Sequence, residues 1–154
     1  MEKIKGFQEF INESIDIYTM DELESKGVYI EIKEESPKSL RVLFSVSGYY
    51  YMVLALPTEV PFVAFGNSDD FGENIELEEL LNRDISRFAL SVVFSVLRYW
   101  TDKFGVKEFN YMVKNDGIRQ PLYRYYLDKH FPDFSISIKR IEEEDKLEVN
   151  LSKV

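Results

Sequence analysis

The feature that most constrains the fold is one helix-length segment, residues 85–104, whose apolar residues recur every three or four positions. Asp84 or Ser86 can cap its start, and Gly105 follows its end. An apolar stripe this wide has to be covered by other elements of the fold. We therefore predict a central, buried helix, with its stripe formed by Ile85, Phe88, Ala89, Val92, Val93, Val96, Leu97, Trp100 and Phe104.

Two predicted hairpins flank this helix in the sequence. Residues 41–46 (RVLFSV) and 49–56 (YYYMVLAL) are rich in β-branched and aromatic residues, and Ser47-Gly48 between them suits a tight turn. Residues 134–141 and 146–151 flank EEED and predict a second hairpin. Single strands are predicted over 28–33 and 107–114, and the short run 62–65 fits a strand and a loop equally well.

The remaining segments predict helices and turns. Residues 4–18 have helical spacing, residues 67–84 form an acidic connector with a short helix, and Asn115-Asp116-Gly117 is a turn. Pro121 lies in the first turn of a helix that ends before Pro132. The sequence thus predicts one domain over residues 1–154. Its class is α+β, with a mixed, mostly antiparallel sheet, helices packed on it, and local parallel pairing around the central helix.

Composition excludes several classes of function. The formal net charge is -9 and the sequence pI is about 4.7, which argues against nucleic-acid and anionic-membrane binding. The chain has no Cys, which excludes thiolate catalysis and disulfides, and its single His leaves few ligands for the usual metal sites. No signal peptide or membrane-length apolar run is evident, which favours a cytoplasmic location and predicts no membrane partner.

The charges are unevenly distributed along the chain. Residues 1–35 carry 4 basic against 10 acidic side chains, and residues 61–85 carry 1 against 7. Residues 86–140 carry 10 basic against 5 acidic side chains, so one basic segment lies within an acidic protein. This segment would either hold an anionic ligand or form salt bridges with the acidic connector, and we favour the salt bridges.

After the predicted central helix, the strand EFNYMVKN (108–115) leads into NDGIRQPLYRYYLDKHF (115–131), a turn and a helix with internal tyrosines. With the order of elements, residues 85–151 resemble the GCN5-related N-acetyltransferase (GNAT) family of acyl-CoA-dependent enzymes. The resemblance implies that Asn115 lies on the cofactor side and that Tyr123 or Tyr126 protonates the departing thiolate. It also implies a splay between the strand 107–114 and its neighbour, which would hold a pantetheine arm.

The sequence departs from that family before the central helix, where a basic, Gly-rich loop would bind the CoA pyrophosphate. Here the chain reads ENIELEELLNRD (73–84), which has no glycine and whose carboxylates would repel phosphate. This departure predicts that the protein binds no cofactor. Acetyl-CoA would be its cofactor only if the protein is a divergent acyltransferase. The sequence does not decide whether the protein is an enzyme.

Other candidate residues have stronger structural explanations. His130 stands near a helix end, where a charged imidazole suits the helix dipole. Glu73 or Glu76 would be the base of an acyltransferase, and Asp69, Asp70 and Glu73 do not match calcium-loop spacing, so we predict no metal.

The leading hypothesis is a small intracellular, non-catalytic GNAT-like domain that binds a macromolecular partner with a basic surface. The run Tyr49–Tyr51 is its candidate contact patch. The alternative is a divergent acyl-CoA-dependent N-acyltransferase.

Overall fold

The computed structural model describes residues 18–46, 48–68, 87–114, 119–141, 143 and 146–154. These residues form seven strands and three helices in a mixed, mostly antiparallel α+β arrangement, as the sequence predicts. The elements in chain order are α2 (Met20–Ser25), β1 (Tyr29–Glu35), β2 (Leu40–Val46), β3 (Tyr49–Leu56), β4 (Phe62–Ser68), α4 (Arg87–Phe104), β5 (Glu108–Lys114), α5 (Arg119–His130), β6 (Phe134–Ile141) and β7 (Lys146–Lys153).

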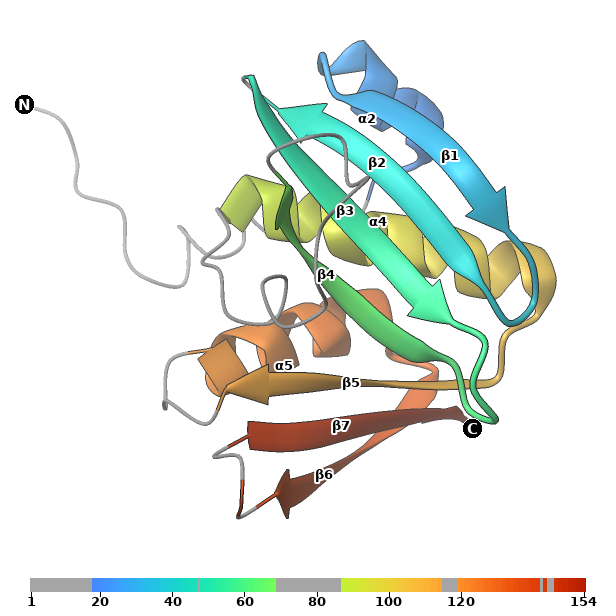
Figure 1. The fold of residues 1–154 in the computed structure, drawn as a ribbon, viewed down its shortest axis with the longest axis vertical. Coiled ribbons are helices and arrows are strands. Elements are labelled where there is room, and N and C mark those ends of the chain that lie inside the picture. The colour runs from blue at the N-terminus through green and yellow to red at the C-terminus, as the bar shows by residue number, and fades with distance from the viewer. Residues whose placement is uncertain (1–17, 47, 69–86, 115–118, 142, 144–145) are drawn as a thin grey trace, which may run out of the picture.

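The seven strands form one sheet in the order β1-β2-β3-β4-β5-β7-β6 (Figure 1). Every neighbouring pair is antiparallel except β4 and β5, which run parallel and are joined by the crossover that contains α4. The predicted run 62–65 is therefore a strand, and it lies at the middle of the sheet. The second crossover, through α5, leads to the outer strand β6, because β7 returns to pair with β5.

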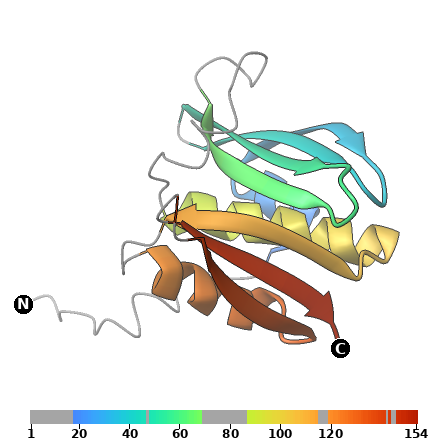
Figure 2. The ribbon, with the colours of Figure 1, turned by 60° about the horizontal axis from the view of Figure 1, so that its bottom comes forward.

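The three helices pack on the same face of the sheet (Figures 1 and 2), and α4 is the centre of the core. Every residue of α4 from Ala89 to Leu97 is buried, which confirms the prediction of a central helix. Trp100 is fully buried and donates a hydrogen bond from its indole Nε1 to the carbonyl of Ser36, 2.7 Å away. This bond ties the last turns of α4 to the turn between β1 and β2.

Alternation along the strands divides the sheet into two faces. On β2, Val42 and Phe44 join the main core, whereas Leu43 points to the opposite face. There Leu43, Met52 and Ala64 form a second, smaller buried cluster, against which Leu54 and Phe62 pack. Strands β2, β3 and β4 are thus apolar on both faces, which explains their continuous hydrophobic runs.

Local signals set the ends of several elements. Gly48 in the β2–β3 turn has φ of 83° and Gly105 after α4 has φ of 62°, a region that favours glycine. Thr19 begins α2 with a capping box, in which its hydroxyl accepts from the Glu22 amide and the Glu22 carboxylate accepts from the Thr19 amide. Residues 4–17 of the predicted first helix, the acidic connector beyond Ser68 and the turn at 115–117 lie outside the described residues, and Tyr18 is not helical.

Candidate functional site

The two parallel strands β4 and β5 separate soon after they meet. Their pairing is limited to Phe62 with Asn110 and Val63 with Tyr111, although both strands continue for several residues. Beyond these pairs, β4 stays bonded to β3 and β5 stays bonded to β7. The facing backbone edges of residues 64–68 and 112–114 are therefore not paired with each other, and Figure 1 shows the two strands diverging. We call this divergence the β4–β5 splay.

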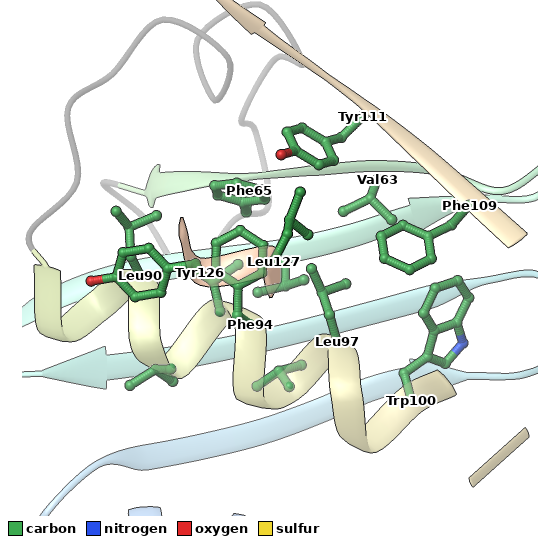
Figure 3. Close-up of a cluster of buried hydrophobic side chains, with 14 of the residues drawn as sticks. Val63, Phe65, Leu90, Phe94, Leu97, Trp100, Phe109, Tyr111, Tyr126 and Leu127 are labelled. Carbon is green, nitrogen blue, oxygen red and sulfur yellow. The ribbon is translucent and has the colours of Figure 1, made fainter. Parts of the chain in front are cut away.

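Aromatic rings fill the helix side of the splay. Figure 3 shows Tyr111 of β5 in the angle between the two strands, next to Phe65 of β4, with ring centroids 6.1 Å apart. Tyr123 of α5 lies 5.7 Å from Phe65 and 6.3 Å from Tyr111, and Phe94 of α4 lies 5.7 Å from Phe65. Rings from four separate elements thus meet at this point of the fold.

The structure places the two candidate tyrosines of α5 differently. Tyr123 contacts both strands of the splay and is 7% exposed. Tyr126 is fully buried, stacks on Phe94 at 5.4 Å and lies 6.4 Å from His130, away from the strands. Tyr123 is therefore the better placed of the two for any ligand in the splay. Asn115, the third candidate, lies outside the described residues.

Tyr111 is a core residue whose phenol has a shifted pKa. Its ring is almost completely buried, and this desolvation, with the nearby Tyr123 phenol, raises the pKa of the Tyr111 phenol. Strand alternation predicts its burial, but only the parallel pairing of β4 with β5 places it at the splay.

His130 differs from the expectation of a charged imidazole at a helix end. The side chain is 2% exposed, and neither ring nitrogen has a hydrogen-bond partner within the described part of the chain. Burial, together with the positive charges of Lys129 and Arg98, lowers the pKa of His130 to about 4. The imidazole is therefore neutral at pH 7, because its desolvation outweighs the helix dipole.

Arg98 joins α4 to the end of α5. Its guanidinium makes a two-pronged pair with Asp133, including an Nη2 to Oδ2 distance of 3.0 Å, and donates to the carbonyl of His130 at 3.3 Å. Its second partner is Asp102, one turn further along α4. Arg124 likewise pairs with Asp128 on its own helix. These basic side chains pair with acids within residues 86–140. The pairs with the acidic connector that the sequence favoured stay a prediction, because the connector lies outside the described residues.

A groove of about 640 Å³ runs between the start of α2 and the outward side of α4. On α4 it is lined by Ser95, Arg98, Tyr99, Asp102 and Lys103, whose spacing places them on one helical stripe. The opposite wall is Tyr18, Thr19, Met20 and Asp21, and the Tyr18 amide donates to Ser95 Oγ at 3.2 Å. We call this feature the α2–α4 groove.

Two hydrogen-bonded contacts hold one wall of the groove against β1. Lys103 Nζ lies 2.6 Å from Glu35 Oε1, and the Tyr99 hydroxyl donates to Glu35 Oε2 at 2.8 Å. The hydrogen bond from Lys103 is the main cause that lowers the pKa of Glu35. The walls of the groove are therefore fixed by bonds to residues outside it.

Acidic side chains outnumber basic ones on α2 and the neighbouring outer strand β1, where the exposed Lys33 pairs with Glu31 at 3.3 Å and Lys26 is exposed after α2. Asp21, Glu22 and Glu24 on α2 are exposed, as is Glu34 on β1, and Glu31 is partly exposed. We call these five side chains the acidic edge. Two large apolar side chains of β1 are also exposed, Tyr29 by 55% and Ile32 by 39%. They point to opposite faces of the sheet, because Ile32 stands opposite the core residue Val42 and Tyr29 lies three residues away.

The run Tyr49–Tyr51 does not form a single contact patch. Successive residues of a strand point to opposite faces, so the three rings are divided between the two sides of the sheet. Tyr49 is 64% exposed at the hairpin end, whereas Tyr51 is 5% exposed and stacks on Phe44 at 5.0 Å.

Metal-binding clusters and membrane-spanning helices are absent from the described residues. These residues contain no group of three or more His, Cys, Asp or Glu side chains arranged to hold a metal ion. None of the described helices combines the length and the apolarity needed to cross a bilayer. The acidic residues that the sequence offered as metal ligands or as a base lie outside the described residues; they are Asp69, Asp70, Glu73 and Glu76.

Comparisons with protein-family models, with curated proteins and with solved structures gave no match to this chain.

Proposed function

We propose that this protein acts by binding a protein partner that presents a basic surface. The observation that carries the proposal is the acidic edge, whose exposed carboxylates lie on α2 and β1, with Tyr29 exposed on one face of β1 and Ile32 exposed on the other. An excess of exposed carboxylates favours association with a partner surface of opposite charge. Because β1 is the outer strand of the described sheet, a partner can approach it without displacing another strand.

Charge reversal on β1 tests this proposal directly. Glu31→Lys with Glu34→Lys is expected to abolish capture of the partner from the native lysate, and moderate salt is expected to weaken capture by the unchanged protein. A matched control is Lys139→Glu with Arg140→Glu, which changes exposed charges on the opposite outer strand, β6. Capture that is equal for both double variants would refute the assignment to the acidic edge.

A second candidate function, favoured by the β4–β5 splay, is that of a divergent acyl-CoA-dependent N-acyltransferase. Unpaired backbone edges between parallel strands suit an extended pantetheine arm, and Tyr123 stands beside them. The residues fit this arm but not the pyrophosphate, because the sequence before α4 is acidic and has no glycine between residues 73 and 84. We therefore derive no catalytic step through the cofactor.

Thermal unfolding with and without excess acetyl-CoA or CoA tests the second candidate. A ligand that binds only the folded state stabilises it by about 2.7 kcal/mol at a hundred times its dissociation constant. Asn115→Ala and Tyr123→Phe should reduce that shift if both residues contact the ligand. An unchanged melting temperature at millimolar ligand would exclude this function.

A further inference from the structure

We propose that β6 is the interface through which two copies of this chain associate, with their β6 strands paired antiparallel about a two-fold axis at Ser137. The pairing joins two seven-stranded sheets into one continuous sheet. The inference goes beyond the proposed function, because β1 lies at the opposite end of the described sheet and its acidic edge stays open in this dimer. Three properties of β6 support it, namely its open edge, its unbroken register and its self-complementary side chains.

The outer edge of β6 carries backbone groups that no described strand pairs. The strand order ends at β6, which Figure 1 shows as the outermost strand beyond β7. The Val154 amide donates to the Asp133 carbonyl at 3.0 Å, and with the register of the two strands this assigns the odd-numbered residues of β6 to β7. The carbonyls and amides of Ile136, Ile138 and Arg140 therefore point outward. Outward groups of this kind are a template for another strand.

The two outer strands of the sheet differ in how well they suit such pairing. The 8 residues of β6 pair with β7 without a break in register, and the strand contains neither proline nor glycine. In β1, the register with β2 shifts between Ile32 and Glu34, and an irregularity of this kind disrupts pairing at a sheet edge. The regular edge is therefore that of β6.

The apolar side chains of β6 complement those of a second copy. In the register centred on Ser137, Ile136 lies opposite Ile138 of the second copy, and Ile138 lies opposite its Ile136. Both side chains are on the core side of the sheet, where Ile136 packs against the main cluster and Ile138 is 39% exposed. Facing apolar pairs of this kind stabilise antiparallel strands. The pairing thus covers the exposed Ile138 in both copies.

The charged side chains of β6 also fit this register. Lys139 lies opposite Ser135 of the second copy, and Arg140 lies opposite Phe134, on whose ring a guanidinium can stack. The two copies of Lys139 are then four strand positions apart, or about 13 Å, which exceeds the Debye length of about 8 Å at physiological ionic strength. No like charges therefore face each other across the two strands.

Disulfide cross-linking tests the interface and its register together. The chain has no Cys, so one introduced thiol can pair only with that of another copy. Residues at the two-fold axis form a non-hydrogen-bonded pair with Cα atoms about 4.5 Å apart, within reach of a disulfide. Ser137→Cys should therefore give a covalent dimer under mild oxidation. Ser135→Cys, also exposed but about 13 Å from its own copy, should not. Equal cross-linking of both variants, or of neither, would overturn the proposal.

Sedimentation equilibrium of the full chain tests the same interface without cross-linking. At about 0.15 M salt, which screens the repulsion between copies of net charge -9, the mass should rise with concentration toward twice 18.2 kDa. Ser137→Lys places two ammonium groups directly opposite each other and should give a folded monomer, since Ser137 is exposed. The matched control is Ser152→Lys, the same change at an exposed position of β7, which should associate like the unchanged chain. A monomeric mass for the unchanged chain, or equal loss in both variants, would refute the dimer.

Discussion

Protonation of His130 should make this fold lose stability in mildly acidic solution. The imidazole is buried between Phe94 and Tyr126, and its pKa falls from an unfolded value of 6.5 to about 4. The difference is about 2.5 units, and at 1.36 kcal/mol per unit it corresponds to about 3 kcal/mol of unfolding free energy. This is a large fraction of the roughly 5–15 kcal/mol that stabilises an ordinary domain.

The direction of the effect follows from proton binding. Above pH 6.5, His130 is neutral in both states and stability does not depend on it. Between pH 6.5 and 4 the unfolded chain binds a proton that the folded chain does not, so stability falls as the pH falls. Below pH 4 both states are protonated and the loss is complete. The cause is the cost of placing an imidazolium in an apolar site near Lys129 and Arg98.

Two measurements check this prediction. Since His130 is the only histidine, its ring resonance in a proton NMR titration needs no assignment and should have a midpoint near pH 4. Urea unfolding at several pH values should show a loss of about 3 kcal/mol between pH 6.5 and 4 that disappears in His130→Phe. The carboxylates of Glu35 and Asp133 titrate in both proteins, so the difference isolates the histidine. A midpoint near 6.5, or identical pH profiles, would refute the reasoning.

Three further predictions concern packing and backbone conformation, and urea unfolding followed by the fluorescence of Trp100, the only tryptophan, measures all of them. Arg98→Lys keeps the charge but loses the two-pronged pair with Asp133, and should cost about 1 kcal/mol; an unchanged midpoint would show that the pair contributes nothing. Phe94→Ala should cost about 4 kcal/mol, since it opens a cavity among four aromatic rings, and a loss below roughly 2 kcal/mol would contradict that packing. Gly105→Ala should cost about 1 kcal/mol because φ at this position is 62°, and a neutral result would contradict the left-handed conformation.

Elements with a strong local pattern were predicted well. The apolar stripe of α4 depends on the spacing of its apolar residues, and the hairpin of β2 and β3 depends on one turn glycine. Both signals lie within a short stretch of sequence. The short strand β4 was ambiguous because its buried side chains on both faces hide any alternation. Its place beside β5 depends on a partner more than forty residues away in the chain.

The candidate site was less predictable than the fold. Tyr123 and Tyr126 are three residues apart and have similar neighbours in the sequence, yet one contacts the splay and the other contacts His130. The sequence also suggested a charged His130, because it shows the helix end but not the aromatic residues that remove water from the ring. The α2–α4 groove joins residues about eighty positions apart and has no local signal.

The sequence by itself determined the acidic charge, the α+β class and the buried central helix of this protein, because composition and periodicity are properties of the chain alone. Only the tertiary structure decided which charges remain available to a ligand. Arg98 and Lys103 are paired with Asp133 and Glu35 across the fold, and Asp21 is not paired with any described residue. Ion pairs of this kind depend on distances in space, which the order of residues does not contain.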